Sequence, residues 1–292
     1  MFERLALVGV GLIGSSIARA ARATGAVRSI VASARSQATR ARVAELGIVD
    51  EVAESNAAAV DGADLVIVCI PVGQCGPVAA EIAPRLAPGA VVSDVGSVKG
   101  SVVRDMAPHL PPHVHFVPAH PVAGTEHSGP DAGFAELFIN RWCILTPPEG
   151  TDPAAVERLA AFWRKLGANV ETMSVAHHDI VLAVTSHLPH LIAYTVVGMA
   201  DDVEKLVTRS EVMKFSAGGF RDFTRIAASD PTMWRDVCLA NRDALAGELH
   251  EYRALLARLQ TALEAGDGDA LEAVFRAAAE CRRAHAPRLD AE

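Results

Sequence analysis

Short apolar segments alternate with amphipathic segments through the first 175 residues of the chain. The apolar segments are continuous rather than alternating with polar residues, which is typical of strands in a parallel sheet covered on both faces. The pattern predicts strands over residues 5–10, 29–33, 65–71, 90–96, 114–120, 142–147 and 169–173. Helical periodicity predicts helices over residues 14–25, 37–47, 78–86 and 152–167. This order of elements predicts a doubly wound α/β domain.

The pattern changes after about residue 175, where strand-like segments stop. Long helices are predicted over residues 176–202, 232–266 and 270–286. One face of the second helix is apolar, because leucines recur near helical spacing at Leu245, Leu249, Leu256, Leu259 and Leu263. Such a face could bury itself in a core of its own or against a second copy of the chain. We therefore predict an α/β domain over residues 1–175 and an all-helical domain over residues 176–292.

Composition narrows the classes of protein and of partner. The 292 residues are 50% hydrophobic with a net charge of −8 and no long basic run, so nucleic acid is not an expected partner. The five cysteines (Cys69, Cys75, Cys143, Cys238 and Cys281) form no CxxC pair, which indicates a reduced cytoplasmic compartment and no metal site. The apolar N-terminus is interrupted by glycines, so we expect neither a secretory leader nor a membrane span.

Glycines follow the first predicted strand with a meaningful spacing, as Gly9-x-Gly11-x-x-Gly14. In a dinucleotide site the first glycine permits the turn, the second admits the pyrophosphate and the third allows the helix to pack closely. A glycine-rich turn in an unrelated fold is the alternative. The strand–loop–helix context favours a Rossmann-type nucleotide site, in which Leu12 and Ile13 would also contact the cofactor.

The end of the second strand lacks the acidic residue that commonly binds the ribose 2′-hydroxyl of NAD. Ser33, Arg35 and Ser36 stand there instead. A guanidinium and hydroxyl groups suit a 2′-phosphate, so the sequence favours NADP, although NAD stays open. The alternative is that Arg35 is a solvated surface residue. Ile70 and Pro71, at the end of the strand over residues 65–71, are also expected beside the cofactor.

A histidine between two prolines, His120, follows the strand over residues 114–120. Ligands of doubly wound sheets bind beyond the carboxyl ends of strands, where Ser97 and Lys99 are also expected. A histidine beside a nicotinamide can take a hydroxyl proton as hydride leaves the same carbon, and a serine hydroxyl could hold its tautomer. The alternative is a solvated or capping histidine.

Two polar clusters lie in the helical part. Ser186, His187 and His190 surround Pro189, which should kink the helix, and they are interpreted as pocket lining rather than as metal ligands. Residues 176–179 are interpreted as a helix start. Further on, two arginines and a tryptophan lie near the paired glycines Gly218 and Gly219, namely Arg221, Arg225 and Trp234. We expect them to bind an anionic substrate with an unsaturated ring. A surface helix start with exposed arginines remains the alternative.

Five blocks together resemble the prephenate/arogenate (cyclohexadienyl) dehydrogenases of tyrosine biosynthesis. They are GVGLIGSSIA, DVGSVKG, HPVAGTEHSG, SHLPHLIAY and GGFRDFTRIAASDPTMWRD. The resemblance implies oxidative decarboxylation of prephenate or arogenate with a nicotinamide cofactor, a homodimer formed through the helical domain, and tyrosine as a candidate inhibitor.

The resemblance also implies residue roles. His120 matches the base that accepts the ring hydroxyl proton, and Ser97 matches the serine that hydrogen-bonds it. Arg225 matches the arginine that binds the substrate carboxylate. His190 and Trp234 match side-chain specificity positions, with Ser186 and His187 beside them and Arg221 at the pocket entrance. Two rival functions are a β-hydroxyacid dehydrogenase, which would need a lysine in the helical domain, and a non-catalytic NADP-sensing module.

Overall fold

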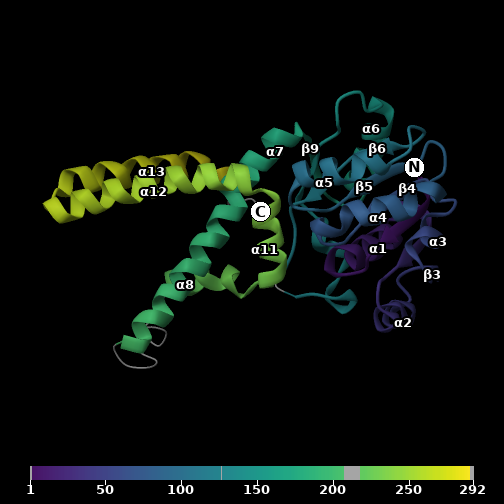
Figure 1. Cartoon of the computed structure of the whole chain (residues 1–292), viewed down its shortest axis with the longest axis horizontal. Coiled ribbons are helices and arrows are strands. Elements are labelled where there is room, and N and C mark those ends of the chain that lie inside the picture. The colour runs from purple at the N-terminus through teal and green to yellow at the C-terminus, as the bar shows by residue number, and fades with distance from the viewer. Residues whose placement is uncertain (1, 126, 207–217, 290–292) are drawn as a thin grey trace. The chain divides into compact units, whose positions relative to one another are not determined.

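The computed structural model describes residues 2–125, 127–206 and 218–289, so Glu126 of the block HPVAGTEHSG lies outside the described residues. The chain divides into two compact units, Met1–Arg242 and Asp243–Glu292. The predicted boundary between an α/β domain over residues 1–175 and a helical domain over residues 176–292 stays a prediction. Figure 1 shows the mixed α/β part and the helical segments that follow it.

A parallel six-stranded sheet in the order β3-β2-β1-β4-β5-β6 forms the centre of the first unit. Its strands are β1 Phe2–Val8, β2 Val27–Ser33, β3 Glu51–Ala53, β4 Leu65–Val68, β5 Val91–Asp94 and β6 His115–Phe116. The covering helices are α1 Leu12–Thr24, α2 Gln37–Leu46, α3 Asn56–Val60, α4 Cys75–Ile82, α5 Lys99–Met106 and α6 Pro153–Lys165. The strand order reverses between β1 and β4, and ligands of doubly wound sheets bind at such a switch point, where the glycine loop after β1 lies.

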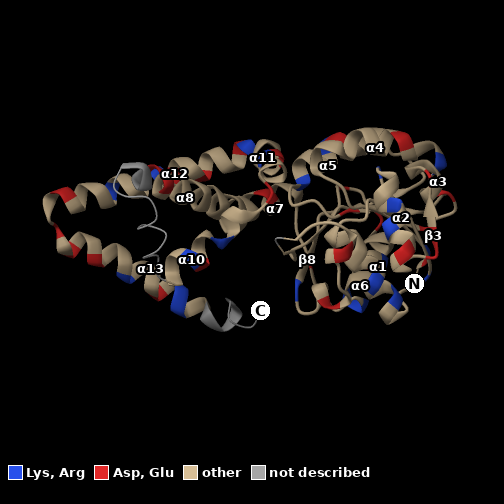
Figure 2. Cartoon of the chain, turned by 90° about the horizontal axis from the view of Figure 1, so that it is seen from below, with Lys and Arg blue, Asp and Glu red and all other residues tan. Residues whose placement is uncertain are grey.

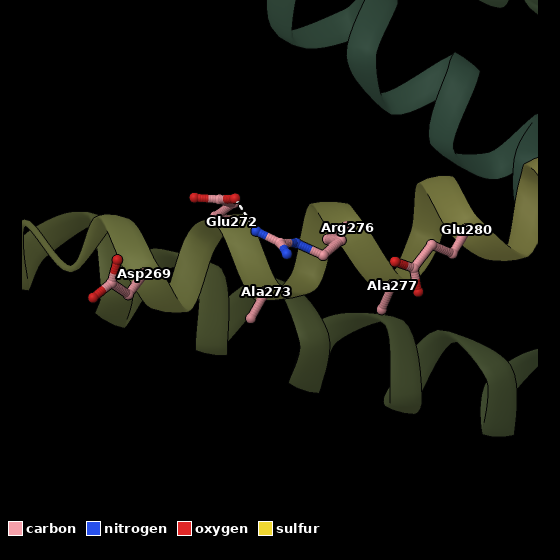
Figure 3. Close-up of a pocket in the computed structure, with 6 residues that line it drawn as sticks. All are labelled: Asp269, Glu272, Ala273, Arg276, Ala277 and Glu280. Carbon is pink, nitrogen blue, oxygen red and sulfur yellow. Dashed lines mark hydrogen bonds and ion pairs between the residues drawn. The ribbon is translucent and has the colours of Figure 1, made fainter.

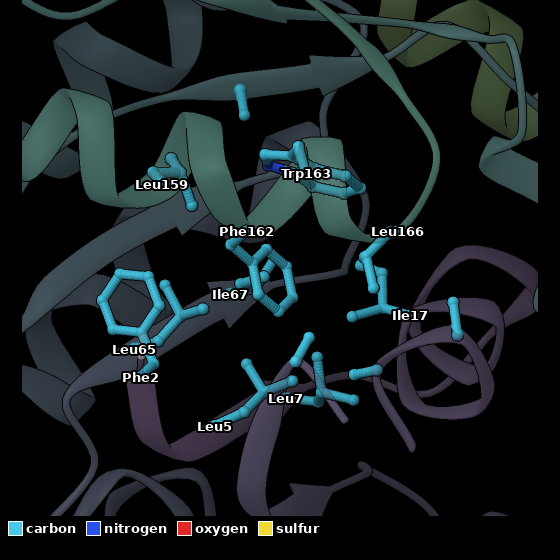
Figure 4. Packing of buried hydrophobic residues seen from close by; sticks show 14 of the residues in the cluster. Phe2, Leu5, Leu7, Ile17, Leu65, Ile67, Leu159, Phe162, Trp163 and Leu166 are labelled. Atoms are coloured by element: carbon cyan, nitrogen blue, oxygen red, sulfur yellow. The ribbon is translucent and has the colours of Figure 1, made fainter. Parts of the chain in front are cut away.

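The continuous apolar strands bury both of their faces, as the sequence predicts. Leu5 and Leu7 of β1 pack in a cluster with Ile17 of α1 and with Phe162 and Trp163 of α6 (Figure 4). The alternate residues of β1 belong to a second cluster, which also contains buried side chains of α3, α4 and α5. A parallel strand covered by helices on both sides has no polar face to display, which is why its sequence shows no period of two.

The predicted strand over residues 114–120 is wrong as a single element. The structure divides it into β6 in the parallel sheet and β7 Ala119–Pro121, which pairs antiparallel with β8 Trp142–Leu145. A second sheet of three strands, β7-β8-β9, is completed by β9 Asn169–Thr172, parallel to β8. Pro118 lies between β6 and β7 and has no N–H to extend the parallel ladder, so the chain leaves the first sheet there.

The helical part of the chain contains α7 Val175–Leu182, α8 Leu188–Leu206, α10 Gly218–Thr224, α11 Pro231–Ala240, α12 Arg242–Ala265 and α13 Gly268–Leu289. Ala183–His187 forms a π-helical turn between α7 and α8, two residues before Pro189 in the first turn of α8. The single helix predicted over residues 232–266 is wrong, because it is divided at Asn241 between α11 and α12. The buried Asn241 amide hydrogen-bonds other elements, as described below, which explains the break.

One helical stretch, Val175–Asp202, is long and apolar enough to cross a membrane by length and composition, with a mean hydropathy of 1.6. Core helices of soluble proteins meet the same criterion. This stretch carries His178 and His187, both fully buried in polar contacts with other residues of the first unit. Figure 2 shows that basic and acidic residues are interspersed along the chain rather than gathered by sign.

Candidate active site

The glycine loop joins β1 to α1 next to the end of β4. Gly9 has a φ of +95°, and a Cβ there would lie 2.4 Å from the Cys69 carbonyl oxygen and 2.7 Å from the Ile70 side chain. A Cβ on Gly14 would lie 2.4 Å from the Gly9 carbonyl oxygen. Gly11 is the N-cap of α1, and no side chain caps the helix there. No described atom lies within 4 Å of the position that a Cβ on Gly11 would take.

This loop fits a dinucleotide. The first N–H groups of α1 are not capped by a side chain, and they point out of a helix terminus whose dipole favours anions. Gly9 and Gly14 are required for packing, whereas Gly11 leaves open space where a pyrophosphate would approach. The predicted cofactor residues Leu12 and Ile13 open α1, and Ile70 lies beside Gly9 with Pro71 following it.

Alanine at Gly14 and alanine at Gly11 should therefore have different effects. Gly14→Ala should lower Tm by several degrees, because overpacking against backbone costs about 1–3 kcal/mol. Gly11→Ala should leave Tm of the cofactor-free protein unchanged but weaken cofactor affinity roughly tenfold, because the methyl group occupies the phosphate space. Thermal melting and a fluorescence titration with cofactor measure the two effects. Unchanged affinity in Gly11→Ala would contradict the phosphate role of this loop.

The three residues expected around a 2′-phosphate have different surroundings. Ser33 is buried and donates from its hydroxyl to Asn56 Oδ1 at 2.8 Å. Ser36 caps α2, and its Oγ accepts from the Thr39 amide at 3.0 Å. Arg35 is exposed. Of the three, the Arg35 side chain is therefore the one best placed to reach a ligand without breaking an existing contact.

A buried ion pair holds the carboxyl end of β5 against β7. Lys99 Nζ donates to Asp94 Oδ2 at 2.5 Å and to the Ala119 carbonyl oxygen at 2.6 Å, and both charged side chains are fully buried. Asp94 also accepts from the amides of Gly96 at 2.7 Å and Ala119 at 3.3 Å. The pair fixes the backbone immediately before His120 and after β5, where Ser97 lies.

His120 is nearly buried in β7, and its Nδ1 lies 2.9 Å from His178 Nε2. Burial holds the pKa of His120 well below its usual value of 6.5, and nearby His178, Lys99 and His187 lower it further. The imidazole is therefore neutral near pH 7 and able to accept a proton. Among the described residues, Ser97 makes no side-chain hydrogen bond to His120, so the predicted Ser97–His120 contact stays a prediction.

The pocket residues from the helical part lie together. His190 stacks on Trp234 with ring centroids 3.5 Å apart, and His187 meets the same ring edge-on at 6.1 Å. The Ser186 carbonyl oxygen lies 2.9 Å from His190 Nδ1. In the described part of the chain, Trp234 Nε1 is buried without a hydrogen-bond partner, whereas His187 interacts with the backbone of Ser97.

Arg225 is exposed and lies close enough to His190 for its positive charge to help lower the pKa of His190, after burial as the largest cause. It begins the 3₁₀ turn Arg225–Ala228 before α11. Arg221 lies on α10 and is exposed. The structure thus brings His120, His187, His190 and Trp234 into one neighbourhood with the loop that carries Ser97, because Val98 packs on Trp234.

Sequence reasoning missed three polar residues of this neighbourhood. Residues 176–179 do start a helix, with Ser174 as the N-cap, but His178 and Asp179 also face His120 and the start of α5. Asn241 donates to the Asp179 carbonyl oxygen at 2.8 Å and lies 3.1 Å from His187 Nδ1. The only local signal was a pair of polar residues, His178–Asp179, in an apolar helix.

The hollow lined by Asp269, Glu272, Ala273, Arg276, Ala277 and Glu280 on α13 has a different character (Figure 3). Its charged side chains are exposed, and Glu272 pairs with Arg276 along the same helix. Nothing in it offers a buried polar group to a ligand. In the described residues, no group of three or more His, Cys, Asp or Glu side chains could hold a metal ion.

Two family models match most of the chain. Residues 17–172 match the prephenate dehydrogenase nucleotide-binding domain, and residues 174–277 match the prephenate dehydrogenase dimerization domain. The chain belongs to the prephenate dehydrogenase family. A cyclohexadienyl dehydrogenase from Zymomonas mobilis is 44% identical over 97% of this chain and 96% of its own length. A Bacillus subtilis prephenate dehydrogenase is 36% identical over 97% of this chain and 76% of its own length.

Solved structures of this family share the whole fold. A prephenate dehydrogenase from Aquifex aeolicus, in complex with hydroxyphenyl propionate and NAD+, superposes with a TM-score of 0.86 at 32% identity, covering 97% of this chain and 98% of the other. A Synechocystis arogenate dehydrogenase gives 0.82 at 28% identity, covering 97% and 99%. The predicted family, the Rossmann-type domain followed by a helical one, and a nicotinamide cofactor are confirmed. The β-hydroxyacid alternative is set aside.

Proposed function

We propose that this member of the prephenate dehydrogenase family oxidises and decarboxylates prephenate, arogenate or both. The observation that carries the proposal is the buried His120, whose pKa is lowered by burial, beside the cluster of His187, His190 and Trp234. A bound nicotinamide would supply the acceptor for the hydride of ring carbon C4. His120 takes the C4 hydroxyl proton, the electrons of the C1–carboxylate bond restore the aromatic ring, and carbon dioxide leaves.

The residues supply a base, orientation and charge in this scheme. Ser97 hydrogen-bonds the reacting hydroxyl or His120, and Arg225 holds a substrate carboxylate. The substrate ring and its side chain are lined by His187, His190, Ser186 and Trp234, with Arg221 at the entrance.

The test is absorbance at 340 nm when the protein is mixed with cofactor and either prephenate or arogenate, side by side. No increase with either substrate under both cofactors would contradict the proposal and favour a non-catalytic nucleotide-sensing module.

We propose further that NADP is preferred over NAD, because Arg35 stands where an acid would select NAD. Arg35→Ala should raise the KM for NADP roughly tenfold or more, since a guanidinium–phosphate contact is lost, and should leave the KM for NAD nearly unchanged. Arg28→Ala, at an exposed position on β2, the strand that ends just before Arg35, is the control. Equal kcat/KM for the two cofactors in the parent protein would disprove the preference.

We propose a cytoplasmic homodimer that buries apolar faces of the helical domain. The second family match is a dimerization domain, and only 22% of the most apolar window in Val175–Asp202 is buried within the chain. Met199, Leu263 and Phe275 are more than half exposed.

Tyrosine shares its ring with the product, so we also propose it as an inhibitor that competes with substrate. Rates measured by absorbance at 340 nm with and without tyrosine test this.

A further inference from the structure

Three side chains form an unbroken hydrogen-bonded line behind the proposed base. His120 Nδ1 lies 2.9 Å from His178 Nε2, and His178 Nδ1 lies 2.8 Å from Asp179 Oδ1. The two imidazole rings meet edge-on, with centroids 5.1 Å apart and planes inclined by 67°. His178 is fully buried, so neither histidine can exchange its partner for bulk water.

The carboxylate at the end of the line is itself fixed. Asp179 Oδ1 accepts from the Lys99 amide and Oδ2 accepts from the Gly100 amide, each at 2.8 Å. These amides open α5, where the helix dipole favours a negative charge. The fit is close, since a Cβ on Gly100 would lie 2.7 Å from Asp179 Oδ2. With backbone donors on both oxygens, Asp179 is an ionised acceptor, and its pKa is lowered by the His178, Lys99 and Gly100 hydrogen bonds against the opposing effect of burial.

Counting protons along the line leaves one arrangement. An ionised carboxylate can only accept, so His178 must carry its proton on Nδ1. Neutral His178 then presents a lone pair at Nε2, and burial keeps it neutral by lowering its pKa. A hydrogen bond between two ring nitrogens needs one proton, so His120 must carry it on Nδ1. The lone pair of His120 is thereby left on Nε2.

We propose that His178 and Asp179 are positioning residues that set the tautomer of His120 and so make its Nε2 the proton-accepting atom. This inference rests on the proposed role of His120 as the base. Asp179 acts through His178, and neither residue touches the reacting atoms. The line also joins α7 to α5, so the orientation of the base is tied to the loop that carries Ser97.

The same line stabilises His120 after it has taken a proton. The imidazolium donates through Nδ1 to His178, whose other nitrogen faces a carboxylate, so a negative charge lies two hydrogen bonds away. The other charged or titratable groups near His120 are Lys99 and His187. Those near His178 are Lys99, Asp94 and Asp179. Lys99 is paired with Asp94, so Asp179 is the carboxylate directly bonded within the line.

The first experiment reads the tautomer in the unmodified protein. Nitrogen-15 and carbon-13 NMR of histidine-labelled holoenzyme, with His120→Asn used to assign the signal, should show His120 protonated at Nδ1 near pH 7. His178 should show the same tautomer. Finding His120 protonated at Nε2 would overturn the proposal whether or not any variant folds.

The second experiment compares two substitutions of His178 with a neighbour. His178→Leu removes the acceptor and should lower kcat on the order of 10²-fold with KM and cofactor Kd within a few-fold. His178→Gln keeps an oxygen that can accept from His120 Nδ1 and should restore most of the lost kcat. His177→Leu makes the same change at an exposed residue one position earlier and should behave like the parent.

Equal kcat in the leucine and glutamine variants would show that His178 serves packing only and would overturn the proposal. The dependence of kcat on pH separates a positioning role of His178 from a packing role. Loss of the hydrogen bonds from His178 should shift the pH at which kcat falls on the acid side, whereas a packing defect should lower kcat equally at every pH. Failure of the base role is a distinct outcome, since His120→Asn would then turn over normally while the NMR tautomer stayed as proposed.

Discussion

Replacing His120 by asparagine should lower kcat by about 10²–10⁴-fold while leaving the fold and the cofactor affinity unchanged. The side chain is almost completely buried and its Nδ1 is engaged by His178, so Nε2 is the nitrogen that can take the substrate proton. An asparagine amide can still donate to His178, but it offers no basic nitrogen. Steady-state rates at 340 nm and a cofactor titration measure the two quantities.

The dependence of kcat on pH gives a second test of the role of His120. A base works when deprotonated, and the pKa of His120 lies well below 6.5 because of burial first and the proximity of His178, Lys99 and His187 second. The parent enzyme should therefore keep its kcat as the pH falls through 6.5 and lose it only at lower pH, and the residual activity of His120→Asn should lack this limb. His177→Asn, at an exposed position, is the control. An asparagine variant with parental turnover would remove His120 from the mechanism.

Replacing Arg225 by alanine should raise KM for prephenate or arogenate roughly 10²-fold or more. The chain carries a net charge of −8, and prephenate has two carboxylates, so local positive charge is needed to bind it. Arg225 lies near enough to His190 to lower that pKa, which puts its charge beside the stacked His190–Trp234 pair. A guanidinium–carboxylate pair is a strong, oriented contact, and its loss leaves the substrate anion unpaired.

Two comparisons make the result specific to Arg225. Arg225→Lys should recover part of the affinity, because ammonium keeps the charge but cannot form two parallel hydrogen bonds. Arg235→Ala removes the same charge from the neighbouring helix, where the exposed guanidinium pairs with Asp236, and should leave KM unchanged. Cofactor affinity should be unaffected in all three. If Arg225→Ala binds both substrates normally, the carboxylate site lies elsewhere.

The N-terminal half of the chain could be predicted well because its physics is local. Continuous apolar strands, helix periodicity and the turn at Gly9 are set by neighbouring residues, and β1, β2, β4, β5, β8, β9, α1 and α6 all lie within the predicted segments or overlap them. The elements of the first sheet and its covering helices that were missed are short: β3, α3 and α5 have three, five and eight residues, too few to show a clear period. The strand through residues 114–120 failed because local pattern cannot reveal a change of sheet.

The sequence by itself determined the family, the fold class, the glycine loop and the identity of the candidate base, because glycine spacing, strand periodicity and residue type are properties of short segments. Only the tertiary structure decided what surrounds that base. His120 and His178 are 58 residues apart, and the Lys99–Asp179 contact spans 80 residues. A hydrogen bond needs two atoms within about 3 Å, and no periodicity encodes that distance across separate elements. The proton order along His120, His178 and Asp179 therefore follows from packing, since it is the fold that brings a carboxylate, two buried rings and the start of α5 together.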